Sequence, residues 1–142
     1  MNLKKLFQNL CEKNNFEINP NQLDLIKRLK KFHNQNFNKS FLQKIFSKND
    51  SKSAFYLYGD VGVGKTMILN FFFDQLVEIK LRQHFNEFMI SFHDFAHERK
   101  ENNEENIINQ FVKDLKSKTE LIYFDEFQVT NIVDAMILGK LF

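Results

Sequence analysis

Eight residues near the middle of the chain have the spacing of a phosphate-binding loop. They fit the pattern G-x-x-x-x-G-K-[ST] and are Gly59, Asp60, Val61, Gly62, Val63, Gly64, Lys65 and Thr66. Glycines let the backbone bring its N–H groups close to a polyphosphate, because no Cβ stands in the way. The lysine supplies positive charge to the β- and γ-phosphates, and the threonine hydroxyl can ligate Mg²⁺. The pattern therefore predicts a site for Mg·ATP.

A phosphate loop requires a strand before it and a helix after it. Residues 54–58, Ala-Phe-Tyr-Leu-Tyr, form an apolar and aromatic run typical of a strand. Residues 67–77, from Met67 on, contain neither Gly nor Pro, so they predict a buried helix, which Gly64 is expected to open. The free N–H groups and the dipole at the start of that helix favour an anion. The alternative, a glycine turn with a surface lysine, does not account for these flanking elements.

A second stretch with chemical potential is the acidic pair Asp125-Glu126. It follows the short apolar run 121–124, which is typical of a parallel strand buried on both faces. Asp125 is predicted to hold Mg²⁺ together with Thr66, directly or through water. Glu126 is predicted to activate a water for attack on the γ-phosphate, which makes Glu126 and Lys65 the expected catalytic residues. Such a pair also occurs in solvated turns, but the strand before it favours the catalytic interpretation.

The remaining patterns complete an alternation of strands and helices. We expect a second strand within 83–90, helix or loop from about residue 92, and a solvated connection over 98–106. A helical stripe follows at Ile107, Ile108, Phe111, Val112 and Leu115. Residues 132–142 predict a helix that is apolar around most of its circumference, with Asn131 as its cap and Asp134 three residues on. The predicted fold class is α/β, a P-loop NTPase core whose parallel sheet is incomplete, with about three strands.

The first 52 residues differ from the rest in charge. They carry 11 Lys and Arg against 4 Asp and Glu, whereas residues 53–142 carry 9 against 14. We therefore divide the chain into a helical, basic segment, 1–52, and the first part of an ATPase domain, 53–142. A basic segment suits nucleic acid, acidic lipid or an acidic partner, but no nucleic-acid motif accompanies it, so a solvated helix face is favoured.

Two helices are expected within this basic segment. The first carries Leu3, Leu6, Phe7 and Leu10 at helical spacing. The second begins with Asn19 as its cap and Pro20 in its first turn. It carries a stripe of Leu25, Leu29 and Phe32, with Leu23 and Ile26 beside it.

Composition narrows the class of protein. Hydrophobic residues make up 43% of the chain, with 18 Phe, which is enough for a packed core. The single cysteine, Cys11, excludes a disulfide framework and a cysteine-based zinc site, and we expect it to fill apolar space. No apolar run approaches the length of a membrane span, so the expected location is cytoplasmic.

Three stretches together carry a resemblance to a known family. They are residues 56–67 around the phosphate loop, residues 82–89 with His93, and Phe-Asp-Glu-Phe-Gln-Val-Thr at 124–130 with the helix after it. They resemble the ZapE-type AAA+ ATPases, also called the ATPase-family-gene-one or lactation-elevated-one family. Asn-Pro-Asn-Gln at 19–22 is similar to the family's entry to its N-terminal helix. The resemblance covers about residues 19–142.

This resemblance implies an AAA+ fold, Mg·ATP hydrolysis and work as a ring-like oligomer. Bacterial members are associated with cell division and the tubulin-like division protein, and mitochondrial relatives with inner-membrane respiratory proteins. The family pattern continues past residue 142 with a sensor strand and an arginine finger. We therefore expect the chain to be the N-terminal part of such an ATPase, working as a homo-oligomer or with a complementing C-terminal half.

Three functions are open at this point. The first is an ATPase, and the second is a catalytically inactive nucleotide-binding or protein-interaction fragment of a split gene. The third is a nucleic-acid-associated P-loop protein, which does not explain the block at 124–130. Because loss of an arginine finger alone lowers turnover by about 10³–10⁵, the chain alone is expected to bind Mg·ATP weakly and to hydrolyse little.

Overall fold

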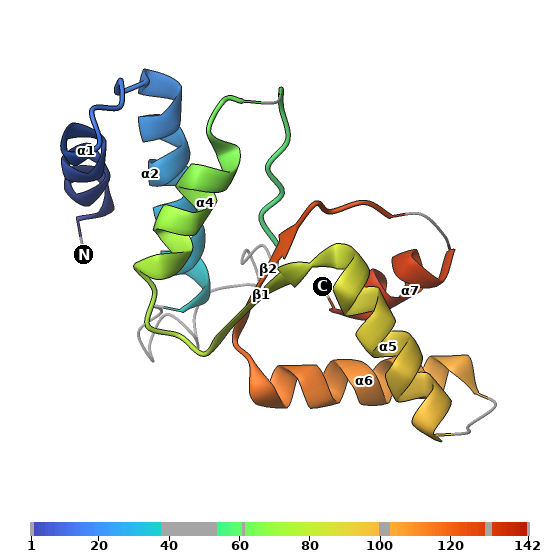
Figure 1. The fold of residues 1–142 in the computed structure, drawn as a ribbon. Helices are drawn as coiled ribbons and strands as arrows, with labels where there is room; N and C mark the ends of the chain where they lie inside the picture. Colours follow the sequence, from blue (N-terminus) through green and yellow to red (C-terminus); the bar gives the residue numbers. More distant parts are fainter. Residues whose placement is uncertain (1, 38–53, 61, 100–102, 130–131, 142) are drawn as a thin grey trace. The chain divides into compact units, whose positions relative to one another are not determined.

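The structure, a computed structural model, describes residues 2–37, 54–60, 62–99, 103–129 and 132–141. These residues form six helices and two strands (Figure 1). They belong to two compact units, Met1–Leu76 and Val77–Phe142. The boundary predicted after residue 52 falls outside the described residues and stays a prediction.

The first unit begins with helix α1 (Leu3–Lys13). Asn2 caps this helix, because its Oδ1 accepts a hydrogen bond from the Lys5 amide at 3.2 Å. The buried stripe is Leu3, Phe7 and Cys11, which follow one another at intervals of four residues. The expected helix is thus confirmed. Of its predicted apolar residues, Leu3 and Phe7 are buried, whereas Leu6 is 39% exposed.

Helix α2 (Pro20–Asn36) starts where the sequence predicts. Asn19 Oδ1 accepts a hydrogen bond from the Asn21 amide at 2.9 Å, and Pro20 is the first helical residue. The buried residues are Ile26, Leu29 and His33. The expected stripe of Leu25, Leu29 and Phe32 is therefore rotated by about one residue, because His33 is buried in place of Phe32.

Residues 54–58 are not a strand, contrary to the prediction. Their side chains alternate in exposure, with Phe55 and Leu57 half-buried and Tyr56 and Tyr58 exposed. That alternation is the period of an extended chain. A strand also needs a hydrogen-bonded neighbour, and in the described part of the chain the sheet consists of two other segments.

Helix α4 (Lys65–Asp74) confirms the helix predicted behind the phosphate loop, although it ends three residues earlier than expected. Its buried residues are Ile68, Phe71 and Phe72. Phe71 packs edge-on against Phe7 of α1, with 5.2 Å between ring centroids. Helices α1 and α4 thus contribute to one apolar core.

The second unit contains the parallel pair β1 (Lys80–His84) and β2 (Leu121–Asp125). In their register Arg82 lies opposite Tyr123, and His84 lies opposite Asp125. The predicted strand at 121–124 is confirmed, and it extends to Asp125. It is half-buried along its length, contrary to the expected burial on both faces. The described sheet has two strands where about three were expected.

The second strand was predicted too late in the chain. Residues 85–90 belong to helix α5 (Phe85–Arg99), and the strand before it is the more polar β1. Phe85, Phe88, Met89 and Phe92 are buried at intervals typical of a helix, which explains why this stretch does not form a strand.

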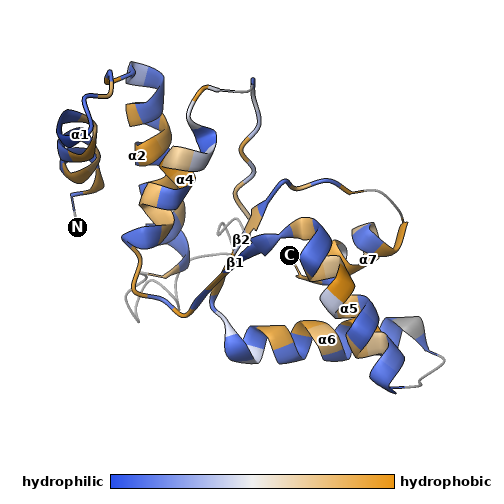
Figure 2. Ribbon diagram, viewed as in Figure 1, coloured by the Kyte–Doolittle hydropathy of each residue, from blue (hydrophilic) through white to orange (hydrophobic). Residues whose placement is uncertain are grey.

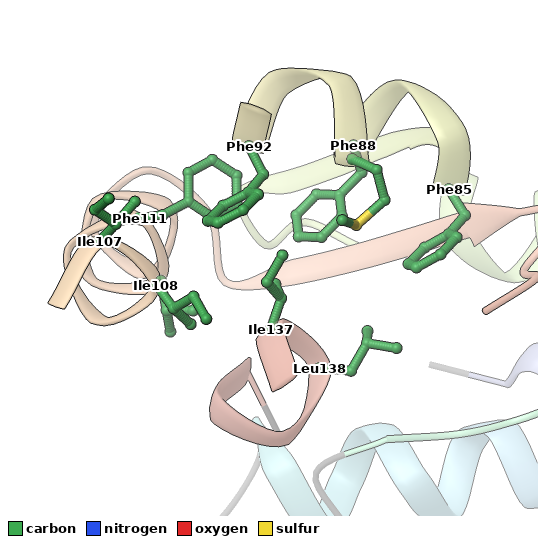
Figure 3. Close-up of a cluster of buried hydrophobic side chains, with 10 residues drawn as sticks. Phe85, Phe88, Phe92, Ile107, Ile108, Phe111, Ile137 and Leu138 are labelled. Carbon is green, nitrogen blue, oxygen red and sulfur yellow. The ribbon is translucent and has the colours of Figure 1, made fainter. Parts of the chain in front are cut away.

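Helices α5, α6 (Glu104–Lys118) and α7 (Ile132–Leu141) enclose the core of this unit. Figure 2 shows hydrophobic and hydrophilic residues alternating along α6, which is the predicted amphipathic pattern. Figure 3 shows Ile137 of α7 near Phe88 of α5 and Ile108 of α6, with Leu138 on the side of Phe85, and all of them belong to one buried cluster. The helices predicted for α6 and α7 are confirmed, whereas the expected cap Asn131 lies outside the described residues. Helical structure reaches Arg99 and resumes at Glu104, so the connection expected over 98–106 is shorter than predicted.

Candidate nucleotide site

The phosphate loop leads directly into α4 through glycines in the left-handed region. Gly62 and Gly64 both have φ of +84°, a backbone conformation that residues with a Cβ adopt only with strain. Gly64 is the N-cap residue of α4. The sequence pattern thus coincides with a backbone that needs glycine. Val61 of the loop lies outside the described residues.

The first turn of α4 offers backbone N–H donors. A glycine has no side chain with which to cap a helix, and none of the hydrogen bonds described for α4 caps this end from a side chain. The first helical bond runs from the Ile68 amide to the Gly64 carbonyl at 3.0 Å. The amides of Lys65, Thr66 and Met67 precede that bond, at the end of a helix that favours an anion.

Lys65 is folded back over the loop. Its Nζ donates to the Gly59 carbonyl at 2.8 Å and to the Asp60 carbonyl at 2.6 Å. These bonds hold the ammonium over the loop, close to the backbone that precedes Gly62. Thr66, one residue on, is exposed. Both side chains are therefore accessible to a ligand at the loop.

A residue from α2 also contacts the loop. Gln22 Nε2 donates to the Val63 carbonyl at 3.2 Å, across 41 positions of sequence. Sequence reasoning singled out Gln22 only as part of the resemblance at 19–22. No local signal places this amide against the loop.

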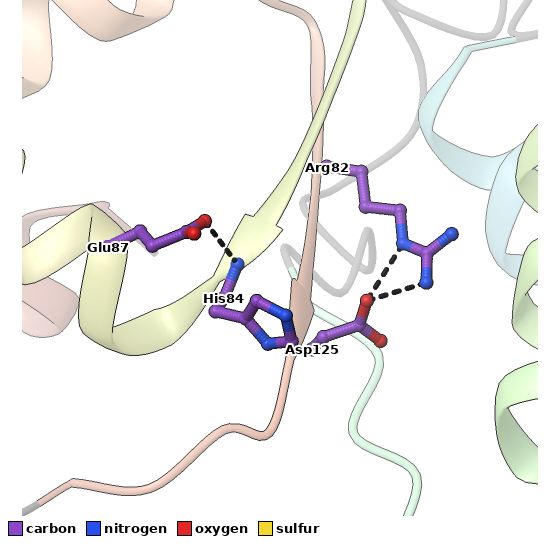
Figure 4. A network of polar contacts seen from close by, with 4 residues as sticks. All are labelled: Arg82, His84, Glu87 and Asp125. Atoms are coloured by element: carbon purple, nitrogen blue, oxygen red, sulfur yellow. Dashed lines mark hydrogen bonds and ion pairs between the residues drawn. The ribbon is translucent and has the colours of Figure 1, made fainter.

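The acidic pair lies at the end of β2, in the second unit. Asp125 is the last residue of the strand, and Figure 4 shows its carboxylate beside the Arg82 guanidinium of β1. Arg82 Nε and Nη2 both contact Asp125 Oδ2, at 2.8 and 2.7 Å. Arg82 also lies over the Tyr123 ring, 5.1 Å from its centroid. Sequence reasoning found Asp125 but missed this cationic partner.

The surroundings of Asp125 favour its charged form. Burial by itself would raise the pKa of Asp125, but hydrogen bonds from Tyr123 and Arg82, with the nearby positive charge, outweigh burial and lower it. The pKa of Tyr123 is raised, first by burial and then by its hydrogen bond to Asp125. A carboxylate that stays ionised is a hard oxygen donor of the kind that Mg²⁺ prefers.

Glu126 follows the strand in an unusual backbone conformation. Its φ is +52°, in the left-handed region, and its side chain is exposed. Non-glycine residues in this region are strained and occur preferentially at functional sites.

A hydrogen bond fixes the end of β1. Glu87 of α5 accepts it from the His84 amide at 3.3 Å, and it connects the end of β1 to the start of α5 (Figure 4).

Comparison with known proteins decides the family. The family model described as AFG1-like ATPase matches residues 4–142. The chain belongs to the AFG1-like ATPase family. This confirms the resemblance stated from the sequence and identifies the fold as a P-loop NTPase type, with six described helices and a two-stranded parallel sheet.

Curated relatives of the AFG1-like chain come from animals, yeast and bacteria. Lactation elevated protein 1 homolog B of Danio rerio is 37% identical over 110 residues, covering 70% of this chain and 22% of the relative. The protein C115.02c of Schizosaccharomyces pombe is 33% identical over 118 residues, covering 71% and 26%. Cell division protein ZapE of Escherichia coli K12 is 37% identical over 98 residues, covering 67% and 25%.

The matched part of the AFG1-like chain spans about a quarter of the length of these relatives. No solved structure matches the chain significantly. Among the helices of the described residues, none is both long and apolar enough to cross a membrane.

Proposed function

We propose that this AFG1-like protein binds Mg·ATP at residues 59–67 and hydrolyses it. The observation that carries the proposal is the start of α4. There a left-handed Gly64 opens a helix without a side-chain cap in the described structure, and the Lys65 ammonium lies over the loop carbonyls. Backbone donors and one cation therefore gather where a triphosphate would be held.

Each proposed residue has a distinct task. Lys65 would leave its loop carbonyls to contact the β- and γ-phosphates. Thr66 and Asp125 would hold Mg²⁺ through oxygen, which fits the donor preference of that ion. When bound, Mg²⁺ neutralises negative charge on the phosphates. Glu126 would accept a proton from the attacking water.

A role in cell division is a further part of the proposal. It is supported by the name of the Escherichia coli relative, Cell division protein ZapE. The resemblance adds a ring-like homo-oligomer and the tubulin-like division protein as candidate partners. These partners, and the cytoplasmic location, stay predictions.

A second candidate function is nucleotide binding without turnover. The observation that favours it is the ion pair between Arg82 and Asp125, because the carboxylate proposed to hold Mg²⁺ already has a cation partner. Under this alternative Lys65 still matters for binding, whereas Glu126 has no chemical role.

Binding and turnover measured on the same variants separate these candidates. We expect Lys65→Ala to weaken Mg·ATP binding by at least about tenfold, because it removes charge-assisted contacts to phosphate. Lys27→Ala, which removes an exposed positive charge from α2, is the matched control and should bind like wild type. Equal affinity of Lys65→Ala and wild type in calorimetry would contradict the proposed site.

Glu126→Gln tests the chemical step. It keeps the size of the side chain and removes the base, so it should bind Mg·ATP normally and release little phosphate. If wild type binds but shows no more turnover than Glu126→Gln, the second candidate function is favoured.

A further inference from the structure

Gln22 connects the N-terminal helices to the phosphate loop within the first unit. It lies in the first turn of α2, whose start is fixed by the Asn19 cap. Its amide nitrogen donates to the Val63 carbonyl at 3.2 Å. Val63 directly precedes Gly64, the residue that opens α4. The contact therefore holds the loop residue that lies next to the first turn of α4, whose backbone amides are the proposed phosphate donors.

The orientation of this amide follows from its partner. A backbone carbonyl can only accept a hydrogen bond, so the nitrogen of Gln22 must face Val63. Gln22 Oε1 is buried, and it has no hydrogen-bond partner among the described residues. Burying an acceptor without a donor is unfavourable. In the described structure, the hydrogen bond from Gln22 Nε2 to the Val63 carbonyl is therefore the polar contact that holds this amide at the loop.

Gly64 provides an independent sign that Gln22 shapes the loop. A Cβ built on Gly64 would lie 2.9 Å from Gln22 Nε2, so the end of the Gln22 side chain would have to move aside. A side chain at position 64 would therefore displace the end of the Gln22 side chain from the loop. The two residues fit each other, although they belong to distant parts of the sequence.

We propose that Gln22 is a positioning residue that fixes the phosphate loop to α2 and thereby couples nucleotide binding to the position of that helix. The ligand side of this inference rests on the proposed function, whereas the contact itself does not. α2 is held in the unit by its buried residues Ile26 and Leu29. A displacement of α2 would therefore move Gln22 and release the Val63 carbonyl. By reciprocity, a ligand that fixes the loop would also restrain α2.

Two substitutions of Gln22 test the hydrogen bond separately from the packing. Gln22→Met has similar length and cannot donate, whereas Gln22→Glu places a carboxylate against a carbonyl. Asn21→Ala is the matched control, because Asn21 lies next to Gln22 and its side chain is exposed.

The first measurement is hydrogen exchange of the Ile68 amide, which donates to the Gly64 carbonyl directly behind Val63, without nucleotide. We expect exchange to be about tenfold faster in Gln22→Met, and faster still in Gln22→Glu, with residues 26–33 and the Asn21→Ala protein unchanged. Exchange in both Gln22 variants equal to that of wild type would overturn the proposal. Loss of protection at residues 26–33 in Gln22→Met alone would mean that this variant disturbs α2 itself. The comparison of Gln22→Glu with wild type would then decide.

The second measurement is Mg·ATP affinity. It should fall about tenfold in Gln22→Met and further in Gln22→Glu, while Asn21→Ala binds like wild type. If wild type does not bind Mg·ATP and the exchange result still holds, the proposed function fails but the positioning contact stands. Unchanged affinity with faster exchange would overturn the coupling between α2 and nucleotide.

Discussion

Arg82 and Asp125 lie on adjacent parallel strands, and two nitrogens of the guanidinium contact one carboxylate oxygen, at 2.8 and 2.7 Å. Tyr123, opposite Arg82 in the register, lies under the guanidinium and hydrogen-bonds to the same aspartate. Asp125, which is proposed to hold Mg²⁺, is therefore already paired with a positive charge from the neighbouring strand.

Replacing Arg82 by Ala should lower the free energy of unfolding at pH 7 by about 1 kcal/mol, because the pair is partly exposed. The hydrogen bonds lower the pKa of Asp125 in the folded protein. Their contribution is therefore present above about pH 4, the usual value for an unfolded aspartate, and is lost as pH falls through the folded value.

Urea unfolding of both proteins at pH 7 and at pH 3 checks this prediction. The difference between wild type and Arg82→Ala should shrink at the lower pH. Lys113→Ala, which removes an exposed charge from α6, should differ little from wild type at either pH. A difference that is the same at both pH values would show that the carboxylate does not contribute.

Glu126 should limit stability because of its backbone. Its φ of +52° costs a non-glycine residue about 1 kcal/mol, so Glu126→Gly should raise the free energy of unfolding by about that amount. Asn15 has φ of +54°, but asparagine tolerates this region, so Asn15→Gly should change stability much less. Urea unfolding compares the two. If Glu126→Gly is less stable than wild type, backbone strain is not what distinguishes this position.

The sequence predicted most of the helices because their apolar spacing is clear. The stripe from Ile107 to Leu115 and the cap at Asn19 are local patterns, and both are confirmed. The strand at 80–84 was missed because Arg82, Gln83 and His84 are polar. The prediction placed the strand later, at the aromatic residues that follow them. Residues 54–58 have the composition of a strand, but strand formation depends on a neighbour that composition does not reveal.

Two parts of the candidate site were proposed from short motifs in the sequence. The loop from Gly59 to Thr66 and the pair Asp125-Glu126 could both be found by spacing. Gln22 against Val63 and Arg82 against Asp125 join residues 41 and 43 positions apart. Such contacts depend on the tertiary structure, so they cannot be predicted from a local sequence pattern.

The aromatic core of the second unit should depend on Phe88. This side chain is 1% exposed, and its ring lies 4.8 Å from that of Phe124 and 5.5 Å from that of Phe111. Phe88→Ala should lower the free energy of unfolding by about 3–5 kcal/mol, since it leaves a cavity. Ile90→Ala on the same helix, at a site 52% exposed, should cost far less. Urea unfolding followed by circular dichroism measures both, and similar costs would contradict the described packing.

Two glycine-to-alanine substitutions should have opposite effects on stability. At Gly64 the left-handed φ opposes a Cβ, and the end of the Gln22 side chain would have to move aside, so Gly64→Ala should lower the free energy of unfolding by about 1–2 kcal/mol. Gly139 lies within α7, where an added Cβ meets nothing within 4 Å in the described structure. Gly139→Ala should therefore raise it by about 0.5–1 kcal/mol through helix propensity.

Combining Gly64→Ala with Gln22→Ala separates the two costs at Gly64. The steric part should disappear when the amide is removed, whereas the cost of the left-handed φ should remain. The loss caused by Gly64→Ala should therefore be smaller in the Gln22→Ala background, as measured by urea unfolding of the four proteins. An equal loss in both backgrounds would show that Gln22 does not press against this position.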